Sequence, residues 1–411
     1  MPGSRKPLWI NLCLLNLCIV ALFGLLLRSK IVFSIPVVDY SNLLTAHSHV
    51  ALAGWAGLGL ITLLVYELLP LPVAQKPVFQ WLLLVLEVST LGMAATFPFW
   101  GYNWASASFS SLYFLATFVF AIFFIKQVWA QAVNTTIGLL SIVALVSLLV
   151  STIGPLGQVY ISLSRSTNAV LYRDSIYTFL HFQYNGFFTL AVFALFLNQL
   201  LKKGVPLNGQ ARLFALFLCL AVPPTLFLSL LWHERADFYV IAAVGCVLLL
   251  LTLVFFVLWL RQLQTATLFK EPLARALWRL AVFSFVLKTL LNVGTIFPPL
   301  GRAVYGDRPA IIGFLHLVFL GFLTFYLLAM LVEYGYFKKS HSTVIYPFIL
   351  FGAGIIANEV LLMLQGLSIL LQTTSFVFNW LLWGSSLLLF AGAVWLVVER
   401  YRTGGSSIKK P

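Results

Sequence analysis

Charged side chains are scarce in this sequence, and their scarcity defines the class of protein. Only 9% of the 411 residues are charged, whereas 61% are hydrophobic and the mean hydropathy is +1.01. A chain of this composition has too little polar surface to cover a core in water. The composition therefore predicts an integral membrane protein, with the lipid bilayer as its surroundings.

Cysteine is also rare, and the positions of the thiols argue against several kinds of site. The four cysteines, Cys13, Cys18, Cys219 and Cys246, all lie within apolar runs. This placement argues against a disulfide framework and against a thiolate zinc site. The sequence has no Cys-x-x-Cys-His motif, which excludes covalent c-type haem on this chain. It also has no nucleotide-binding loop, hydrolytic triad or nucleic-acid module, so we expect no nucleic-acid partner.

Apolar runs of about 18 to 25 residues recur along the whole chain, and each could cross a ~30 Å hydrocarbon core as a helix. They predict an all-α fold of twelve transmembrane helices in one polytopic domain, residues 1–411. The runs fall near 9–27, 45–70, 78–98, 107–128, 136–154, 176–201, 212–231, 238–260, 276–297, 310–333, 344–365 and 376–398. The connections 155–175 and 261–275 leave room for an interfacial helix but little more.

Basic residues are distributed unequally over the two sets of connecting segments. Seventeen Lys and Arg residues lie on the side of the N-terminus, and seven lie on the opposite side. Because cytoplasmic segments carry the excess of basic residues, both termini are predicted to face the cytoplasm of a cell membrane. Even-numbered helices would then run from the outer face inward.

Histidines gather at one depth of this predicted bundle. His47 and His49 lie near the start of the second run, His181 near the start of the sixth and His316 near the start of the tenth. Each would sit on the order of 5 to 10 Å below the outer boundary. Neutral imidazole is the commonest metal ligand, and ionisable groups within a membrane usually mark a pathway or a bound group. For any single histidine, a hydrogen bond between helices is the simpler alternative.

The two histidines of the second run cannot bind one ion as a pair. Residues two apart on a helix point about 200° away from each other, so His47 and His49 would serve two groups on opposite sides. Small residues follow them on both faces. They either leave room for a flat macrocycle or permit close helix packing. These small residues are Ala51, Ala53, Gly54 and Gly57.

Twelve helices with histidines on the second, sixth and tenth resemble subunit I of the haem-copper oxidases and nitric oxide reductases. The resemblance implies three arcs of four helices and a low-spin haem, here b-type, held between helices 2 and 10. It implies that either His47 or His49 pairs with His316 in "GFLHLVFLGF". It also implies that His181, in "YTFLHFQYNGFF", takes the place of a copper-binding histidine.

The chain departs from that family in its remaining ligands. The His-x-His pair stands on helix 2 instead of helix 10, and helix 7 has no histidine. A three-histidine copper site therefore cannot be assembled in the family's way, and we expect haem without copper. The stretches "HSHVALAG" and "HLVFLG" are more weakly similar to the NnrS family of haem-containing and copper-containing membrane proteins linked to nitric oxide. A quinol or cytochrome electron donor and further membrane subunits are the partners that these resemblances imply.

Other polar groups lie within the predicted helices. Helix 9 carries Ser284, Lys288 and Asn292 at steps of four, and carboxylates occur at Glu87 of helix 3 and Glu359 of helix 11. Because an unpaired buried charge is costly, Lys288 is expected to pair with these carboxylates. Alternatively, Lys288 would bind a haem propionate.

Two further sets of residues complete the candidate site. Arg302 and Arg308, just before helix 10, would either contact propionates or remain in a solvated loop. On helix 6, the face of His181 continues with polar side chains three and four residues later. A proton path would use Glu87, Tyr184, Asn185, Asn292 and Glu359.

Two classes of function are consistent with these residues. The first is a haem-binding redox protein for electron transfer or for chemistry of nitric oxide or oxygen, with oxidoreductase activity left open. The second is a proton-coupled transporter with a relay of His181, Glu87, Lys288 and Glu359 and no cofactor. Transporter sites usually lie near the midplane, at interrupted helices. The histidines lie near one face, which favours the redox protein.

The first testable prediction concerns topology. Reporter fusions after Gly405 should be active only as cytoplasmic reporters, and fusions at Asn103 only as periplasmic ones, because of the seventeen-to-seven basic asymmetry. A periplasmic signal from the Gly405 fusion would invert the orientation and place the histidines in the inner half of the membrane.

Overall fold

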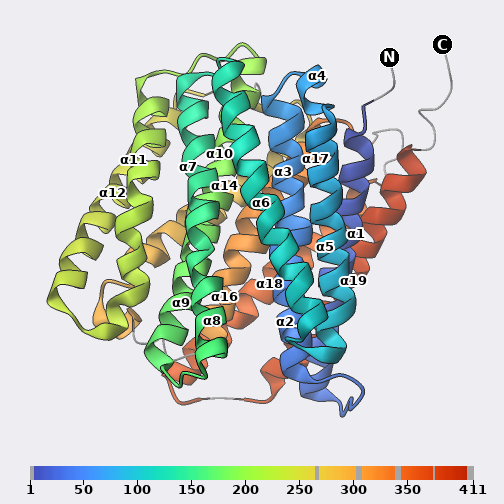
Figure 1. Ribbon diagram of the computed structural model, residues 1–411, viewed down its shortest axis with the longest axis vertical. Coiled ribbons are helices and arrows are strands. Elements are labelled where there is room, and N and C mark those ends of the chain that lie inside the picture. The colour runs from blue at the N-terminus through green and yellow to red at the C-terminus, as the bar shows by residue number, and fades with distance from the viewer. Residues whose placement is uncertain (1–3, 264–267, 302–307, 338–343, 374, 405–411) are drawn as a thin grey trace.

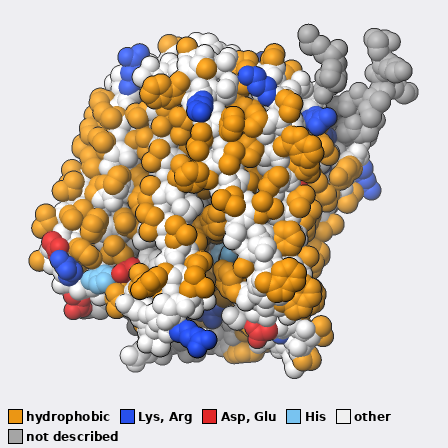
Figure 2. All heavy atoms as spheres, in the orientation of Figure 1, with side chains coloured by type: hydrophobic (Ala, Val, Ile, Leu, Met, Phe, Trp, Pro, Cys, Tyr) orange, Lys and Arg blue, Asp and Glu red, His pale blue; other side chains and the backbone are white. Residues whose placement is uncertain are grey.

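The computed structural model describes residues 4–263, 268–301, 308–337, 344–373 and 375–404, and this part of the chain is helical without strands. Twelve helices in it are long and apolar enough to cross a membrane. They lie side by side in one bundle, with both termini at the same end (Figure 1). Lys and Arg side chains gather mostly at the two ends of the bundle, and the band between them is largely hydrophobic (Figure 2). The all-helical membrane fold expected from the sequence is thereby confirmed.

We number the membrane-crossing helices as spans 1 to 12. Spans 1 to 6 are α1 (Lys6–Val32); α2, η1, α3 and η2 (Tyr40–Val50, Ala51–Gly57, Leu58–Leu63, Leu64–Leu68); α5 (Pro77–Trp100); α6 (Trp104–Ala130); α7 and α8 (Thr135–Ser151, Ile153–Ser164); and α9, η3 and α10 (Ala169–His181, Phe182–Phe188, Thr189–Lys202). Spans 7 to 12 are α11 and η4 (Gly209–Thr225, Leu226–His233); α12 (Ala236–Leu260); α14 (Pro272–Gly294); α16, η5 and α17 (Arg308–His316, Leu317–Thr324, Phe325–Glu333); α18 (Ile345–Leu370); and α19 (Val377–Gly404). The short helix α4 (Leu71–Ala74) joins spans 2 and 3.

The helices are longer than the apolar runs that predicted them. The connection 155–175, expected to hold an interfacial helix at most, is largely helical, because α8 prolongs span 5 and α9 begins span 6. Pro155 lies in the first turn of α8, where a proline is tolerated. The Asn168 side chain accepts a hydrogen bond from the backbone N–H of Leu171 and caps α9. Hydropathy detects the membrane core of a helix, whereas local capping decides where the helix ends.

Spans 2, 6 and 10 form the centre of the bundle. The share of each apolar window buried inside the protein is 78%, 83% and 78% for these three, against 33–56% for the other nine spans that the structure describes. They contact one another through η1 and η5, through η3 and η5, and through α10 with α3 and η2. Spans 1, 5 and 9 pack against spans 2, 6 and 10 respectively. Spans 2, 6 and 10 therefore lie at the centre of the bundle, each packed against the span that precedes it.

Each central span contains a wide, π-helical stretch that begins within two residues of a histidine. The stretches are η1 after His49, η3 directly after His181 and η5 directly after His316. π-Helical turns are rare, and they are frequent at functional sites. In all three spans a glycine follows the histidine by five residues: Gly54, Gly186 and Gly321.

These glycines allow each central span to approach the preceding helix. A Cβ atom at Gly54, Gly186 or Gly321 would lie within 3.0 Å of a polar side chain on span 1, 5 or 9. The facing side chains are Asn16, Ser147 and Ser284. At Gly57 a Cβ would lie 2.5 Å from the Tyr113 hydroxyl. The small residues after His49 therefore serve close helix packing, and any room for a macrocycle has to lie elsewhere.

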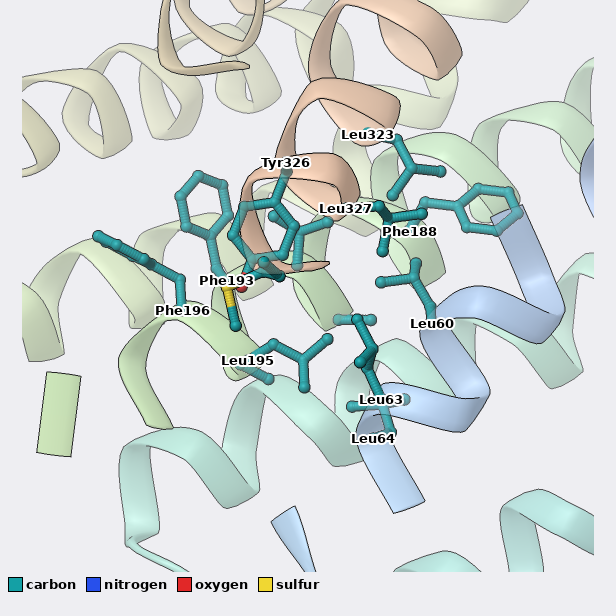
Figure 3. Close-up of a cluster of buried hydrophobic side chains, with 14 of the residues drawn as sticks. Leu60, Leu63, Leu64, Phe188, Phe193, Leu195, Phe196, Leu323, Tyr326 and Leu327 are labelled. Carbon is teal, nitrogen blue, oxygen red and sulfur yellow. The ribbon is translucent and has the colours of Figure 1, made fainter. Parts of the chain in front are cut away.

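Packing differs between the two ends of the central spans. At the end that carries the termini, all six residues of α3 and eight of the nine residues of α17 are buried. Figure 3 shows leucine and aromatic side chains of the three spans meeting there, among them Leu64, Phe193 and Tyr326. At the opposite end, which we call the histidine end, three of eleven residues are buried in α2, two of thirteen in α9 and none of nine in α16.

Ion pairs join the central spans at the end that carries the termini. Glu67 of span 2 pairs with Lys6 of span 1 and lies 2.8 Å from Lys202 Nζ of span 6. Glu333 of span 10 lies 2.6 Å from Lys203 Nζ, also of span 6. The carboxylate side chains are 9% and 5% exposed, so these pairs are largely shielded from solvent. This end is therefore fixed, and the histidine end is the looser one.

The packing of Gly186 is testable by adding one methyl group. Gly186→Ala would place a Cβ 2.4 Å from Ser147 Cβ, so span 6 must shift away from span 5. We expect a loss of about 1–3 kcal/mol of stability, the usual cost of overpacking. Thermal unfolding of the purified protein, followed by tryptophan fluorescence, measures it. The matched control is Gly384→Ala, where no atom lies within 4 Å. Equal effects of the two substitutions would contradict the close contact.

Candidate functional site

Two histidines from the central spans face each other at the histidine end. The ring centroids of His47 in span 2 and His316 in span 10 are 6.5 Å apart, and the rings are inclined by 35°. Nδ1 of His47 lies 3.1 Å from the carbonyl oxygen of Val20, and Nδ1 of His316 lies 2.8 Å from that of Ile312. A carbonyl only accepts, so both Nδ1 atoms carry the proton. Both Nε2 atoms are left as acceptors, with no hydrogen-bond partner among the described residues.

This arrangement suits one metal ion between the two rings. With metal–nitrogen bonds of about 2.0–2.1 Å, two imidazoles on opposite sides of an ion have ring centroids roughly 6 to 6.5 Å apart. The 6.5 Å separation of His47 and His316 matches that value and is too long for a direct hydrogen bond. The carbonyl bonds to Nδ1 are the partners that orient a ligating histidine and fix its tautomer.

The two rings differ in how closely their neighbours pack. Phe314, Leu315 and His316 are only half-buried, although they belong to a central span. On the other side, a Cβ at Gly24 of span 1 would lie 3.3 Å from Cε1 of His47, so span 1 comes close to that ring. Two small cavities of ≈ 10 Å³ lie elsewhere in the bundle and hold no macrocycle. The residues of α16 around His316 are thus less tightly enclosed than those of α17.

Two arginines flank the histidine pair. Arg28 of span 1 lies close enough to interact electrostatically with His47, His316 and Arg308. Arg308 begins span 10, and its guanidinium lies 5.4 Å from the ring centroid of Tyr40. Among the described residues, neither arginine forms an ion pair with a carboxylate. Arg28 and Arg308 therefore place positive charge beside the histidine pair with no paired carboxylate among the described residues.

The structure shows which arginines stand beside the histidine pair, and this set differs from the one that the sequence predicted. Arg308 was predicted as a candidate and stands beside the pair, whereas Arg302 lies outside the described residues. Arg28 was treated only as a topology marker and was missed. One signal for it existed: Gly24 and Arg28 are four residues apart and thus share one face of span 1.

His49 points away from His316 and uses both ring nitrogens in hydrogen bonds. Nδ1 lies 2.9 Å from the Thr45 carbonyl oxygen, so Nε2 accepts from the Tyr102 hydroxyl at 3.1 Å. Its ring packs 4.5 Å from that of Phe97. Of the two histidines that the sequence left as alternatives, His47 is therefore the one opposite His316.

His181 of span 6 is buried and fully hydrogen-bonded. Its Nε2 lies 2.8 Å from the carbonyl oxygen of Val222 and therefore carries the proton. Its Nδ1 accepts from Asn185 Nδ2 at 3.3 Å, because the Asn185 oxygen accepts from Lys288 Nζ at 3.1 Å. Metal binding to His181 would require one of these bonds to break. The described residues contain no cluster of three or more His, Cys, Asp or Glu side chains that could hold a metal.

The expected pairing of Lys288 with carboxylates is wrong. Lys288 Nζ reaches span 6, where it donates to Asn185 and to Thr189 Oγ1 at 2.9 Å. Glu87 accepts from Asn16 at 2.8 Å, and Glu359 accepts from its neighbour Asn358 at 3.2 Å. Spans 3 and 11 pack mainly against other neighbours, so equal depth does not bring these groups together.

The remaining predicted residues of the relay are also dispersed. Tyr184 packs against Phe314 with ring centroids 5.6 Å apart, and Asn292 lines a small cavity beside Lys288. No hydrogen bond among the described residues links Glu87 or Glu359 to Lys288. A continuous proton relay through the predicted groups is therefore absent from the described part of the bundle.

Comparison with known proteins adds no relative. No protein-family model matches the chain, and no curated protein has a significantly similar sequence. The resemblance to oxidase subunit I therefore rests on the helix count and on the histidine positions.

The hydrogen bonds of His181 lead to a prediction about copper. We expect the purified protein to contain far less than one copper per chain, because both ring nitrogens are engaged and no second or third ligand is near. Elemental analysis of wild type and His181→Ala should give the same low copper content. About one copper per chain that disappears in His181→Ala would show that the side chains rearrange into a copper site.

Proposed function

We propose that this protein is a haem-binding integral membrane protein with a redox role, similar in arrangement to subunit I of the haem-copper oxidases and nitric oxide reductases. The observation that carries the proposal is the pair of imidazoles from spans 2 and 10, with ring centroids 6.5 Å apart and both Nε2 atoms unused. The central position of spans 2, 6 and 10, each packed against the span that precedes it, is further support. The resemblance thus gains a geometric argument where sequence similarity offers none.

The residues around the pair fit a haem in distinct ways. His47 and His316 would be its axial ligands, with their tautomers fixed by backbone carbonyls. Arg28 and Arg308 would neutralise its two carboxylates. A b-type haem is the form proposed, because the chain has no Cys-x-x-Cys-His.

A haem held by His47 and His316 would supply one-electron oxidation and reduction. Electron transfer is therefore the role we favour, with a quinol or a cytochrome as the donor. Reduction of oxygen to water is not proposed, because His181 is already hydrogen-bonded at both ring nitrogens. A role linked to nitric oxide would need a second, open site. The setting we propose is the cell membrane, with both termini in the cytoplasm.

The proton-coupled transporter receives less support. Its proposed relay needs Glu87, Lys288 and Glu359 in contact, and each has a different, neutral partner. An amide such as Asn185 also accepts and donates at fixed atoms, so it does not pass a proton along. We therefore keep electron transfer as the single proposal.

Absorption spectra of three alanine variants test the haem assignment. Wild-type protein should show a Soret band and a pyridine haemochrome of b-type. His47→Ala and His316→Ala should lower haem content by roughly 10-fold or more, or leave a five-coordinate iron, because each removes an axial ligand. His49→Ala is the matched control: it removes an imidazole two residues away whose nitrogens bond Thr45 and Tyr102.

The same spectra can overturn the assignment. A wild-type protein without a Soret band after expression with haem supply would refute the haem. Loss of the spectrum in His49→Ala together with its retention in His47→Ala would show that the wrong histidine has been chosen.

A further inference from the structure

A small polar cavity lies away from the histidine pair, between spans 6, 7, 8 and 9. Its volume is ≈ 10 Å³, which holds about one water-sized species. Polar side chains from three of the four spans line it: Asn185, Thr189, Thr225, Lys288, Thr289 and Asn292. Apolar side chains complete the lining, so the cavity is a small, partly polar space within the bundle; they are Leu218, Ala221, Val222, Leu249 and Phe285.

In its ammonium form, Lys288 has one N–H donor that is available to this cavity. Lys288 is only 3% exposed. An ammonium group has three N–H donors. Two of them go to Asn185 Oδ1 at 3.1 Å and Thr189 Oγ1 at 2.9 Å. The third has no acceptor among the described residues.

The two neutral partners are fixed as acceptors toward Lys288. The Thr189 hydroxyl donates to the Tyr184 carbonyl oxygen at 2.6 Å, so its lone pairs face the lysine. The Asn185 amide donates to His181, which in turn donates to Val222. This chain of bonds presents two acceptor oxygens to the Lys288 amino group. No ion pair in the described part of the chain includes Lys288.

Asn292 supplies a second donor to the same space. It follows Lys288 by four residues on span 9, lines the cavity, and is 7% exposed. Its side-chain amide forms no hydrogen bond with any described residue. The hydroxyls of Thr225 and Thr289 donate to backbone carbonyls, so they offer the cavity no free proton. The free donors at the cavity thus belong to Lys288 and Asn292.

We infer that this cavity binds one small monovalent anion of the halide class, held by Lys288 Nζ and the Asn292 amide. A water molecule would accept the free protons but would leave the buried charge unneutralised, which is costly within a membrane. Polyatomic oxoanions are too large for a space of ≈ 10 Å³. The bound anion would stabilise the contact of span 9 with spans 6 and 7, and the inference does not depend on the haem.

Chloride binding and thermal stability test the site together. Purified protein in sodium gluconate is dialysed against radioactive chloride, and its melting temperature is followed by tryptophan fluorescence as chloride or bromide replaces gluconate at constant ionic strength. We expect about one chloride per chain and a melting temperature that rises with halide and then saturates.

Three variants make the test specific. Lys288→Met removes the charge, and Asn292→Leu fills the cavity but keeps the lysine, so both should lose chloride binding and the halide-dependent rise. Lys126→Met, which removes an exposed lysine of span 4, should keep both. The haem-ligand variant His316→Ala should also bind chloride as wild type does, so failure of the haem proposal is separately visible.

Two results would overturn the anion site. One is no chloride above background in wild-type protein, which would leave water as the occupant. The other is chloride binding that persists unchanged in Asn292→Leu or Lys288→Met, which would place the anion elsewhere.

Discussion

The close contact of spans 2, 6 and 10 along the centre of the bundle is the constraint on which the other features depend. The π-helical turns of these spans leave some backbone carbonyl oxygens without the hydrogen bond that a regular α-helix would give them. Lipid offers no water to donate that bond instead. In span 6 the Thr189 hydroxyl donates to the carbonyl of Tyr184, and in span 10 the Thr324 hydroxyl donates to that of Phe319. In both cases the hydroxyl lies five residues further along the chain, so the wide turns are satisfied locally.

Those same hydroxyls then connect the central spans to their neighbours. The Thr324 oxygen accepts from the indole of Trp55 in span 2 at 2.7 Å, and the Thr189 oxygen accepts from Lys288 in span 9. Each hydroxyl thus serves a carbonyl of its own helix and a donor of another helix. These bonds and the ion pairs of Glu67 tie the central spans to one another and to spans 1 and 9.

The sequence predicts how deep in the membrane a residue lies, but not toward which neighbouring helix its side chain points. Hydropathy predicted the twelve helices, and their alternating direction predicted that the starts of helices 2, 6 and 10 lie at one end of the bundle, whereas the orientation inferred from the basic residues stays a prediction. Whether His47 or His49 faces span 10 depends on helix rotation, which only packing determines. The pairing of Lys288 with Glu87 failed for another reason, because spans 3 and 9 pack mainly against other neighbours. The glycine five residues after His49, His181 and His316 was available in the sequence and would have shown the relation between the three central spans.

Charge balance connects the two candidate sites. The chain has 25 Lys and Arg residues and 11 Asp and Glu residues, which gives a net charge of +14. Glu67 and Glu333 are engaged with lysines at the end that carries the termini. Arg28, Arg308 and Lys288 remain within or beside the bundle without carboxylates among the described residues. Since a buried cation needs a counter-charge, Lys288 has a physical reason to draw a small anion from outside the chain. Arg28 is half-buried and Arg308 is exposed, so their charges are partly solvated and would serve the carboxylates of the proposed cofactor.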